Sequence, residues 1–181
     1  MKQALSRSVL WFVVAMVAAV AARADVASFE AEVANALQRF YTDVPVSQTL
    51  ASRSVGMLVF PHVYKAGFGI GGAVGDGALQ VDGQTVQYYR TTGLSLGIQI
   101  GAQARTEIIL FMTQDALDRF RRSANWQAGV DGSITLINTG AAKSIDTDNI
   151  RDPIMGFIFD NRGLMLDASF KGAKYWKIDK Q

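Results

Sequence analysis

The stretch Phe60–Val81, FPHVYKAGFGIGGAVGDGALQV, decides the fold of this chain, because glycine recurs through it at strand spacing. Together with Gly56 just upstream, it holds seven of the 17 glycines, a content that excludes a helix. Gly67, Gly69 and Gly71 fall at period two, so an extended chain presents bare backbone on one face and large side chains on the other. The pattern predicts a strand against which another backbone or a ring packs closely, or at which the sheet bends sharply.

Two nucleotide-binding patterns match this stretch, and both lack the context that they require. Gly67, Gly69 and Gly72 fit GxGxxG, and Val74 extends the match to the glycine-rich loop of kinases. A dinucleotide site needs a helix that opens at the last glycines and holds the pyrophosphate at its N-terminus, whereas AVGDGALQVDG is broken by glycine and ends in a turn signal. A kinase also needs an HRD loop and a DFG metal ligand, which the sequence lacks. We therefore assign these glycines a structural role in a curved sheet.

Residues 1–24 have the three parts of a secretory signal peptide. Lys2 and Arg7 form a positively charged n-region, and Val9–Ala22 is an uncharged apolar run. The tripeptide ARA, which ends at Ala24, is a possible cleavage site. The run is shorter than the about 20 residues of a membrane span. We expect cleavage after this site, and an uncleaved anchor is the alternative. The sequence contains no cysteine, which excludes a lipoprotein anchor and disulfide bonds.

Removal of the predicted signal peptide changes the charge balance. Without Lys2, Arg7 and Arg23, 15 of the 18 basic residues remain against 16 acidic ones, so the net charge becomes −1. This balance gives no reason to expect a nucleic-acid partner. The remaining residues 25–181 suit a single domain that buries roughly two-thirds of its unfolded surface. The expected location is the periplasm or the outside of the cell, in peripheral association with the envelope.

An amphipathic helix is predicted over Asp25–Tyr41. Its apolar side carries Val26, Phe29, Val33, Leu37 and Phe40. Packing on the domain is one interpretation and lying on a membrane surface is the other, although its polar side is acidic as well as basic, unlike that of interfacial helices. The other predicted elements are helices at Ser47–Ser52 and Gln114–Arg122 and strands at Val55–Phe60, Leu79–Val81, Thr85–Tyr89, Leu94–Gly101, Thr106–Met112 and Ile154–Phe159. The turn Asn161-Arg162-Gly163 then leads into Leu164–Phe170.

Two of these strands are expected to form a hairpin, and two are expected to lie near each other. Asp82-Gly83 is a turn signal between Leu79–Val81 and Thr85–Tyr89. The segment Leu94–Gly101 alternates apolar residues with glycine and polar residues, so it is expected near the first glycine-bearing strand.

The C-terminal segment KGAKYWKIDKQ is basic and aromatic. Its candidate binding residues are Lys171, Lys174, Lys177, Tyr175 and Trp176. One interpretation is a headgroup interface, where ammonium groups meet lipid phosphate and rings lie at the apolar boundary. The other is a solvated edge strand whose lysines block further pairing.

The sequence gives no support for an enzyme or a metal site. GLSLG places Ser95 in a GxSxG pattern, but strand alternation continues through it and the only histidine, His62, precedes it in the chain. A single histidine without cysteine leaves no zinc or iron site. The aspartates at 146, 148 and 152 lack the spacing of a calcium loop. We predict a protein without catalytic residues, cofactor or metal.

Three segments together resemble the SYLF domain family, also called the lipid-binding or actin-binding SYLF family. They are VGMLVFPHVYKAGFGIGGAVGDGAL, GLSLGIQIGAQARTEIILFMTQDALDRF and GLMLDASFKGAKYW, in this order from about Ala51 to Trp176. The resemblance implies phospholipid binding without catalysis or cofactor, and some eukaryotic members also bundle actin. It places Lys65, in the KAGFG motif, among the lipid-binding residues. An exported bacterial chain would meet no actin, so we expect anionic phospholipid as the partner.

The sequence thus predicts an α+β fold. Its expected form is a strongly curved or barrel-like antiparallel sheet, with the N-terminal amphipathic helix and one short helix packed on it. The expected function is non-enzymatic binding of anionic lipid in the bacterial cell envelope, by surface docking or in an apolar cleft. The alternative is a structural or protein-interaction module of the envelope without lipid affinity.

Overall fold

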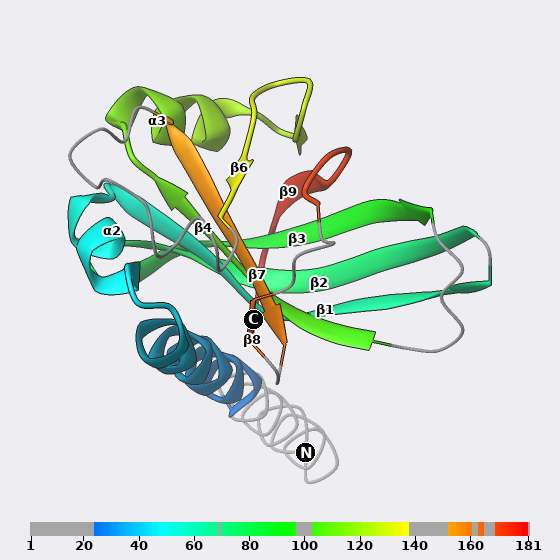
Figure 1. The fold of residues 1–181 in the computed structure, drawn as a ribbon, viewed down its shortest axis with the longest axis horizontal. Helices are drawn as coiled ribbons and strands as arrows, with labels where there is room; N and C mark the ends of the chain where they lie inside the picture. The colour runs from blue at the N-terminus through cyan, green and yellow to red at the C-terminus, as the bar shows by residue number, and fades with distance from the viewer. Residues whose placement is uncertain are drawn as a thin grey trace, which may run out of the picture.

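The computed structural model describes residues 24–68, 70–96, 103–137, 152–160, 163–164 and 169–180. They form an α+β fold, in which helices pack on a strongly curved, mostly antiparallel half-barrel sheet (Figure 1). The N-terminal helix covers residues 24–43, and the helices α2 and α3 cover Ser47–Arg53 and Gln114–Arg122. No helix in these ranges is long and apolar enough to cross a membrane. The first 23 residues of the predicted signal peptide lie outside the described residues.

Nine strands of the described residues belong to one sheet. They are β1 (Gly56–Phe68), β2 (Ile70–Val81), β3 (Gln84–Leu96), β4 (Gln103–Phe111), β5 (Trp126–Gln127), β6 (Thr135–Leu136), β7 (Ile154–Asp160), β8 (Gly163–Leu164) and β9 (Lys174–Ile178). Their spatial order is β5-β9-β3-β2-β1-β4-β7-β6, with β8 paired to β7. Among these pairs only β6 and β7 run parallel. The predicted fold class is confirmed.

The strands β1, β2 and β3 form a meander that extends beyond the helices (Figure 1). The turn between β2 and β3 has Asp82 at φ 51° and Gly83 at φ 75°, the left-handed pair that a two-residue hairpin loop needs. The expected hairpin is therefore confirmed. The two glycine-bearing strands are also neighbours, since Gly72 pairs with Leu94.

The first strand continues beyond its expected end at Phe60. Its register against β2 shifts between Val59 and His62, so Pro61 lies in a bulge, where a missing backbone N–H does not interrupt the ladder. The Pro61 carbonyl accepts a hydrogen bond from Thr106 Oγ1 at 2.9 Å. The bulge lets one strand pass through a proline that the sequence pattern suggests as a strand end.

Close packing explains two of the glycines in β2. A Cβ atom on Gly77 would lie 2.5 Å from Phe60 Cδ1 and 2.8 Å from the Val59 carbonyl oxygen. A Cβ atom on Gly75 would lie 2.6 Å from the His62 carbonyl oxygen. The prediction that a ring or another backbone lies against the glycine-rich strand is confirmed at these positions.

Each face of the sheet has its own hydrophobic core. On the inner face, which α3 covers, Leu58, Phe60 and Tyr89 are buried with Phe120 of the helix. On the outer face, which the N-terminal helix covers, the buried side chains include Val59, Ala78, Ile108 and Phe157. The helix α3 and the N-terminal helix lie on opposite sides of the sheet (Figure 1), so the sheet is the middle layer of the molecule.

Both short helices, α2 and α3, agree with their predictions. The helix α3 begins after Thr113, whose Oγ1 accepts a hydrogen bond from the Ala116 backbone N–H at 3.3 Å. In the segment that follows the predicted turn at residues 161–163, Leu164 belongs to β8, whereas Ser169 and Phe170 lie outside any strand. Residues 165–168 lie outside the described residues.

Candidate functional site

Four neighbouring strands place residues from distant parts of the sequence in rows on the outer face. Directly paired residues of antiparallel strands carry their side chains on the same face. One row across β1, β2, β3 and β9 consists of Tyr64, Val74, Thr92 and Lys174. The adjacent row consists of His62, Asp76, Arg90 and Trp176. We call these two rows the outer-face site.

The outer-face site exposes apolar side chains that the N-terminal helix leaves uncovered. Tyr64 is 55% exposed and Val74 is 47% exposed, and the two are direct cross-strand neighbours. The Tyr64 ring stacks on the ring of His62, with 6.1 Å between their centroids. Lys174 is exposed and Trp176 is half-buried. An apolar strip therefore lies beside cationic side chains on one open surface.

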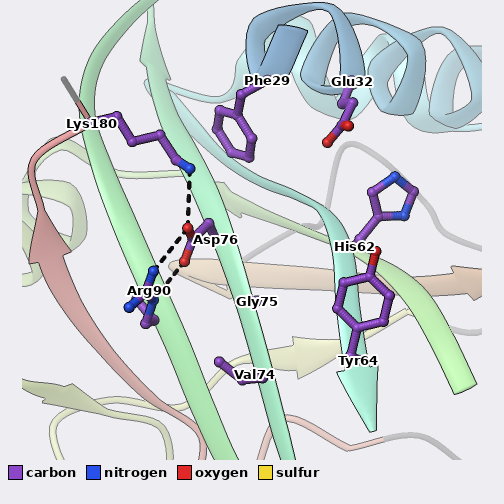
Figure 2. Close-up of a pocket in the computed structure, with 9 residues that line it drawn as sticks. All are labelled: Phe29, Glu32, His62, Tyr64, Val74, Gly75, Asp76, Arg90 and Lys180. Atoms are coloured by element: carbon purple, nitrogen blue, oxygen red, sulfur yellow. Dashed lines mark hydrogen bonds and ion pairs between the residues drawn. The ribbon is translucent and has the colours of Figure 1, made fainter. Parts of the chain in front are cut away.

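A groove of about 300 Å³ separates this strip from the N-terminal helix. Figure 2 shows Phe29 and Glu32 of the helix on one side and His62, Tyr64 and Val74 of the sheet on the other. The groove thus combines a ring and exposed aliphatic surface with charged groups at its rim. Such a mixture fits a ligand that has an apolar part and a charged part.

Asp76 organises the cations at the rim of the groove. Its carboxylate accepts hydrogen bonds from Arg90 Nε at 2.7 Å and from Arg90 Nη2 at 3.1 Å, and Lys180 Nζ lies 3.1 Å from it (Figure 2). Burial alone would raise the pKa of Asp76, but the hydrogen bonds from Arg90 and Lys180 hold that pKa below its ordinary value of 3.8. Asp76 is therefore ionised at neutral pH and holds both cations in place.

The N-terminal helix is tied to the outer face by Glu30. Its carboxylate accepts hydrogen bonds from the Tyr88 hydroxyl at 2.6 Å and from Thr85 Oγ1 at 3.0 Å. Burial, followed by the hydrogen bond to Glu30, raises the pKa of Tyr88 to about 12, so its hydroxyl remains a donor. Phe29 packs edge-on against the Tyr88 ring at 5.8 Å. The expectation that this helix packs on the domain agrees with these contacts.

The structure separates the six predicted binding residues. Lys174 and Trp176 belong to the outer-face site. Lys65 is half-buried on the inner face, where it pairs with Ala73. Lys177 is exposed on the inner side of β9, because it pairs with Tyr89. Lys171 is exposed in the turn before β9.

Tyr175 requires a correction. Its side chain is 1% exposed and packs against Phe60, Phe120 and Trp126, with ring centroids 5.7, 6.1 and 5.8 Å away. Strand alternation turns Tyr175 inward when Trp176 faces outward. It is a core residue in this structure and does not present its ring at the surface.

The second interpretation of the C-terminal segment is also only partly right. The strand β9 lies between β3 and β5, so it is not the last strand of the sheet. However, β5 pairs only with Lys174 and Tyr175, which leaves the other side of Trp176–Ile178 without a partner strand among the described residues.

Sequence reasoning did not single out Tyr64, Val74 or Arg90 as site residues. The local signal for Tyr64 is present, because His62, Tyr64 and Val63 alternate as in a half-buried strand. The Asp82-Gly83 turn sets only the first pairs of β2 with β3, and a register shift between Leu79 and Gln80 then brings Arg90 opposite Asp76. What no local pattern supplies is the pairing of β9 with β3.

The described residues contain no group of three or more histidine, cysteine, aspartate or glutamate side chains that could hold a metal ion. Ser95 lies within β3, directly paired with Gly71 of β2, and not in a strand-to-helix turn. The outer-face site offers binding groups, apolar surface and paired charges.

The sequence profile of the family described as "Ysc84: Las17-binding protein actin regulator" matches residues 92–180. The matched region includes the end of β3, the strand β9 and the helix α3. It therefore contains Thr92, Lys174 and Trp176 of the outer-face site. No curated protein matches the chain.

Proposed function

Because residues 92–180 belong to the Ysc84/SYLF family, we propose that this protein docks on anionic phospholipid through its outer-face site. The family is associated with lipid and actin binding, and its domains are generally non-catalytic. The observation that carries the proposal is the row in which exposed Tyr64 and Val74 continue through Thr92 to exposed Lys174. Aromatic and aliphatic surface beside cations is the composition that a headgroup interface selects.

The proposed contacts follow from the order of residues across the rows. Tyr64 and Val74 meet the apolar boundary of the bilayer, and Trp176 adds an indole ring at the headgroup level. Lys174 and Arg90 lie on the strands β9 and β3, next to that apolar strip, and meet the phosphates. The attraction is electrostatic at an exposed surface, so salt must weaken it.

The proposal includes the location of the protein. The signal peptide predicted over residues 1–24 would deliver the chain to the periplasm or the cell exterior, where envelope lipid is the anionic surface. In this setting actin is not a partner. A protein partner within the envelope is the competing function, and it predicts no affinity for lipid alone.

The first test is flotation of the purified chain with vesicles of neutral lipid and with vesicles that contain phosphatidylglycerol, at about 0.05 and 0.5 M salt. We expect binding to the anionic vesicles only, with a marked loss at the higher salt. Absence of binding to both vesicle types would overturn the proposal. Crosslinking in intact cells would then be used to identify a protein partner.

A matched pair of lysine variants locates the docking surface. Lys174→Gln removes an exposed cation from the outer-face site, whereas Lys177→Gln removes an exposed cation of the same strand that lies on the inner side. The first change should weaken anionic vesicle binding about fivefold, because a cation near the membrane contributes about 1 kcal/mol. The second should leave it unchanged. Equal losses would show that the net charge, and not this surface, governs binding.

A further inference from the structure

A second hollow, of about 430 Å³, adjoins the groove that Figure 2 shows. The two hollows share three charged lining residues, so they form one continuous depression along the N-terminal helix. On the helix side this depression runs from Asp25 in the second hollow to Glu32 in the first. We call it the helix groove. Its charged lining residues are Asp25, Glu32, Asp76, Arg90, Asp179 and Lys180.

Carboxylates outnumber cations in the lining of the helix groove. Four carboxylates face two cations, Arg90 and Lys180, so the lining has a formal net charge of −2 when His62 is neutral. Asp76 is paired with both cations. The other three carboxylates belong to exposed residues and have no ion pair within the described part of the chain. The helix groove therefore attracts cationic ligands.

One ammonium group already occupies the middle of the helix groove. Lys180 Nζ lies 4.0 Å from the centroid of the Phe29 ring and 3.1 Å from the Asp76 carboxylate. Figure 2 shows this ammonium group between the helix and the sheet. An aromatic ring face and a carboxylate both attract an ammonium group. The contacts of Lys180 thus identify a cation site, which the ammonium group of a ligand can enter when Lys180 swings out.

Two carboxylate residues of the helix flank this cation site at different distances. Asp25 lies four residues before Phe29 and Glu32 lies three residues after it, so all three share one side of the helix. At a rise of about 1.5 Å per residue, Asp25 and Glu32 are about 6 and about 4.5 Å from Phe29 along the helix axis. Figure 2 shows the Glu32 side chain pointing from the helix towards His62. The helix groove therefore offers three sites for positive charge in a row, with unequal spacing.

We propose that the helix groove binds a linear aliphatic triamine of the spermidine type. Its middle ammonium group is separated from the terminal ones by four and by three methylene groups, which span about 6 and about 5 Å when extended. The middle ammonium group takes the place of Lys180 Nζ at Phe29 and Asp76. The longer arm reaches Asp25, and the shorter arm reaches Glu32. Displacement of Lys180 changes the net charge of the lining from −2 to −3, which a triamine neutralises.

The second hollow accommodates the longer arm in two ways. Val26 and Ile178 are half-buried in its lining and offer apolar contact to the methylene groups. Asp179 adds a second carboxylate to that of Asp25. This second carboxylate matters in a chain that begins at Asp25, because the α-ammonium group would neutralise one carboxylate and leave the other for the ligand.

The triamine site goes beyond the proposed docking function, which concerns an anionic surface bound by the exposed rows of the sheet. A triamine is a soluble cation, and its site lies between those rows and the helix. Vesicle flotation without amine tests the docking function, and titration with amine in the absence of vesicles tests the triamine site. Failure of either experiment therefore leaves the other proposal intact.

The test is a calorimetric titration of the purified chain at about 0.05 M salt, where charges are screened less than at physiological ionic strength. Spermidine carries the middle ammonium group. Octamethylenediamine has the same length and the same terminal ammonium groups but lacks the middle one. We expect spermidine to bind at least about tenfold more tightly than octamethylenediamine, because only spermidine can replace Lys180 at Phe29 and Asp76.

Two lysine variants test the displacement of Lys180. Lys180→Met removes the group that competes for the cation site, so it should strengthen spermidine binding about fivefold. Lys177→Met is the matched control, since it removes an equal charge from β9 on the inner side of the sheet. It should leave the affinity for spermidine unchanged.

Two carboxylate variants test the contact of the shorter arm. Glu32→Gln removes the carboxylate at that end of the helix groove and should weaken spermidine binding about fivefold. Asp43→Asn removes an equal charge from an exposed residue of the same helix that does not line the groove, so it should change nothing. Amide spectra of all four variants check that the fold is kept.

Binding with the expected preference for spermidine, weakened in Glu32→Gln and strengthened in Lys180→Met, supports the triamine site. Absence of spermidine binding overturns it, and so does equal affinity for spermidine and octamethylenediamine. Equal effects of Lys180→Met and Lys177→Met would also overturn it, because the net charge of the protein would then govern binding.

Discussion

Gly77 of β2 packs directly against the ring of Phe60 in the neighbouring strand β1. A Cβ atom on Gly77 would lie only 2.5 Å from Phe60 Cδ1. The Val59 carbonyl oxygen, at 2.8 Å from the same position, closes the space from the backbone side. A ring can rotate away from a methyl group, but a strand carbonyl cannot do so without loss of pairing. This relationship fixes how closely β1 and β2 approach at the centre of the inner core.

Gly77→Ala should therefore destabilise the protein by about 2 to 3 kcal/mol, because the added methyl overpacks a filled core. Gly72→Ala is the matched control in the same strand, since a Cβ atom there meets no atom within 4 Å. Its effect should stay within about 0.5 kcal/mol. Urea unfolding of the two variants provides the comparison, and equal midpoints would contradict the packing argument.

The ion pairs of Asp76 should make stability depend on pH in the acid range. The folded-state pKa of Asp76 is held below its ordinary value of 3.8, so its contribution is present above that pH and is lost as pH falls through the folded pKa. Asp76→Asn should cost about 1 kcal/mol at neutral pH, a modest value because Arg90 is 45% exposed. The difference between wild type and variant should vanish towards pH 2. If the difference in the free energy of unfolding stayed constant across this pH range, the ionised Asp76 carboxylate would not be its source.

Arg105→Met should have the opposite dependence on pH. The variant leaves the Glu107 carboxylate buried without its guanidinium partner, at a cost of about 3 to 5 kcal/mol at neutral pH. Burial already raises the pKa of Glu107 above 4.5, although Arg105 opposes this shift, and removal of Arg105 raises it further. A raised pKa means that stability is greatest below the unfolded pKa and falls as pH rises through the folded one. The free energy of unfolding of Arg105→Met, measured at pH 5 and at pH 8, gives this pH dependence. The double variant Arg105→Met/Glu107→Gln should show no such dependence.

Substitutions of Tyr175 should distinguish a core residue from a membrane contact. Tyr175→Phe deletes one buried hydroxyl and keeps the ring, so it should change the stability of the protein by less than about 1 kcal/mol. Tyr175→Ala should cost about 3 to 5 kcal/mol, because it empties a ring site in the core. Vesicle flotation of Tyr175→Phe should equal that of wild type. If Tyr175→Phe weakened vesicle binding without a loss of stability, Tyr175 would be a membrane contact and the core assignment would be wrong.

Local sequence signals were sufficient for much of the fold. The turn at Asp82-Gly83 predicted the hairpin because this dipeptide tolerates two left-handed residues in succession. The helix α3 followed from the apolar spacing of Ala116, Leu117 and Phe120. The course of β1 through Pro61 was not predictable in this way, because a bulge depends on what the neighbouring strands do.

The candidate site depends on contacts that no local pattern contains. Lys174 and Trp176 were identified from their residue types, but their place beside Val74 requires the pairing of β9 with β3, far apart in sequence. The inward turn of Tyr175 follows from the same pairing. A basic and aromatic segment predicts chemistry, whereas strand alternation decides which of its residues can reach a partner.

The contacts of Lys180 have a consequence for the shape of the outer groove. Lys180 Nζ lies 4.0 Å from the ring centroid of Phe29 and 3.1 Å from Asp76, so it joins the first described helix to the middle of the sheet. The rim of the outer groove therefore keeps its shape only while residues from widely separated parts of the sequence stay packed together.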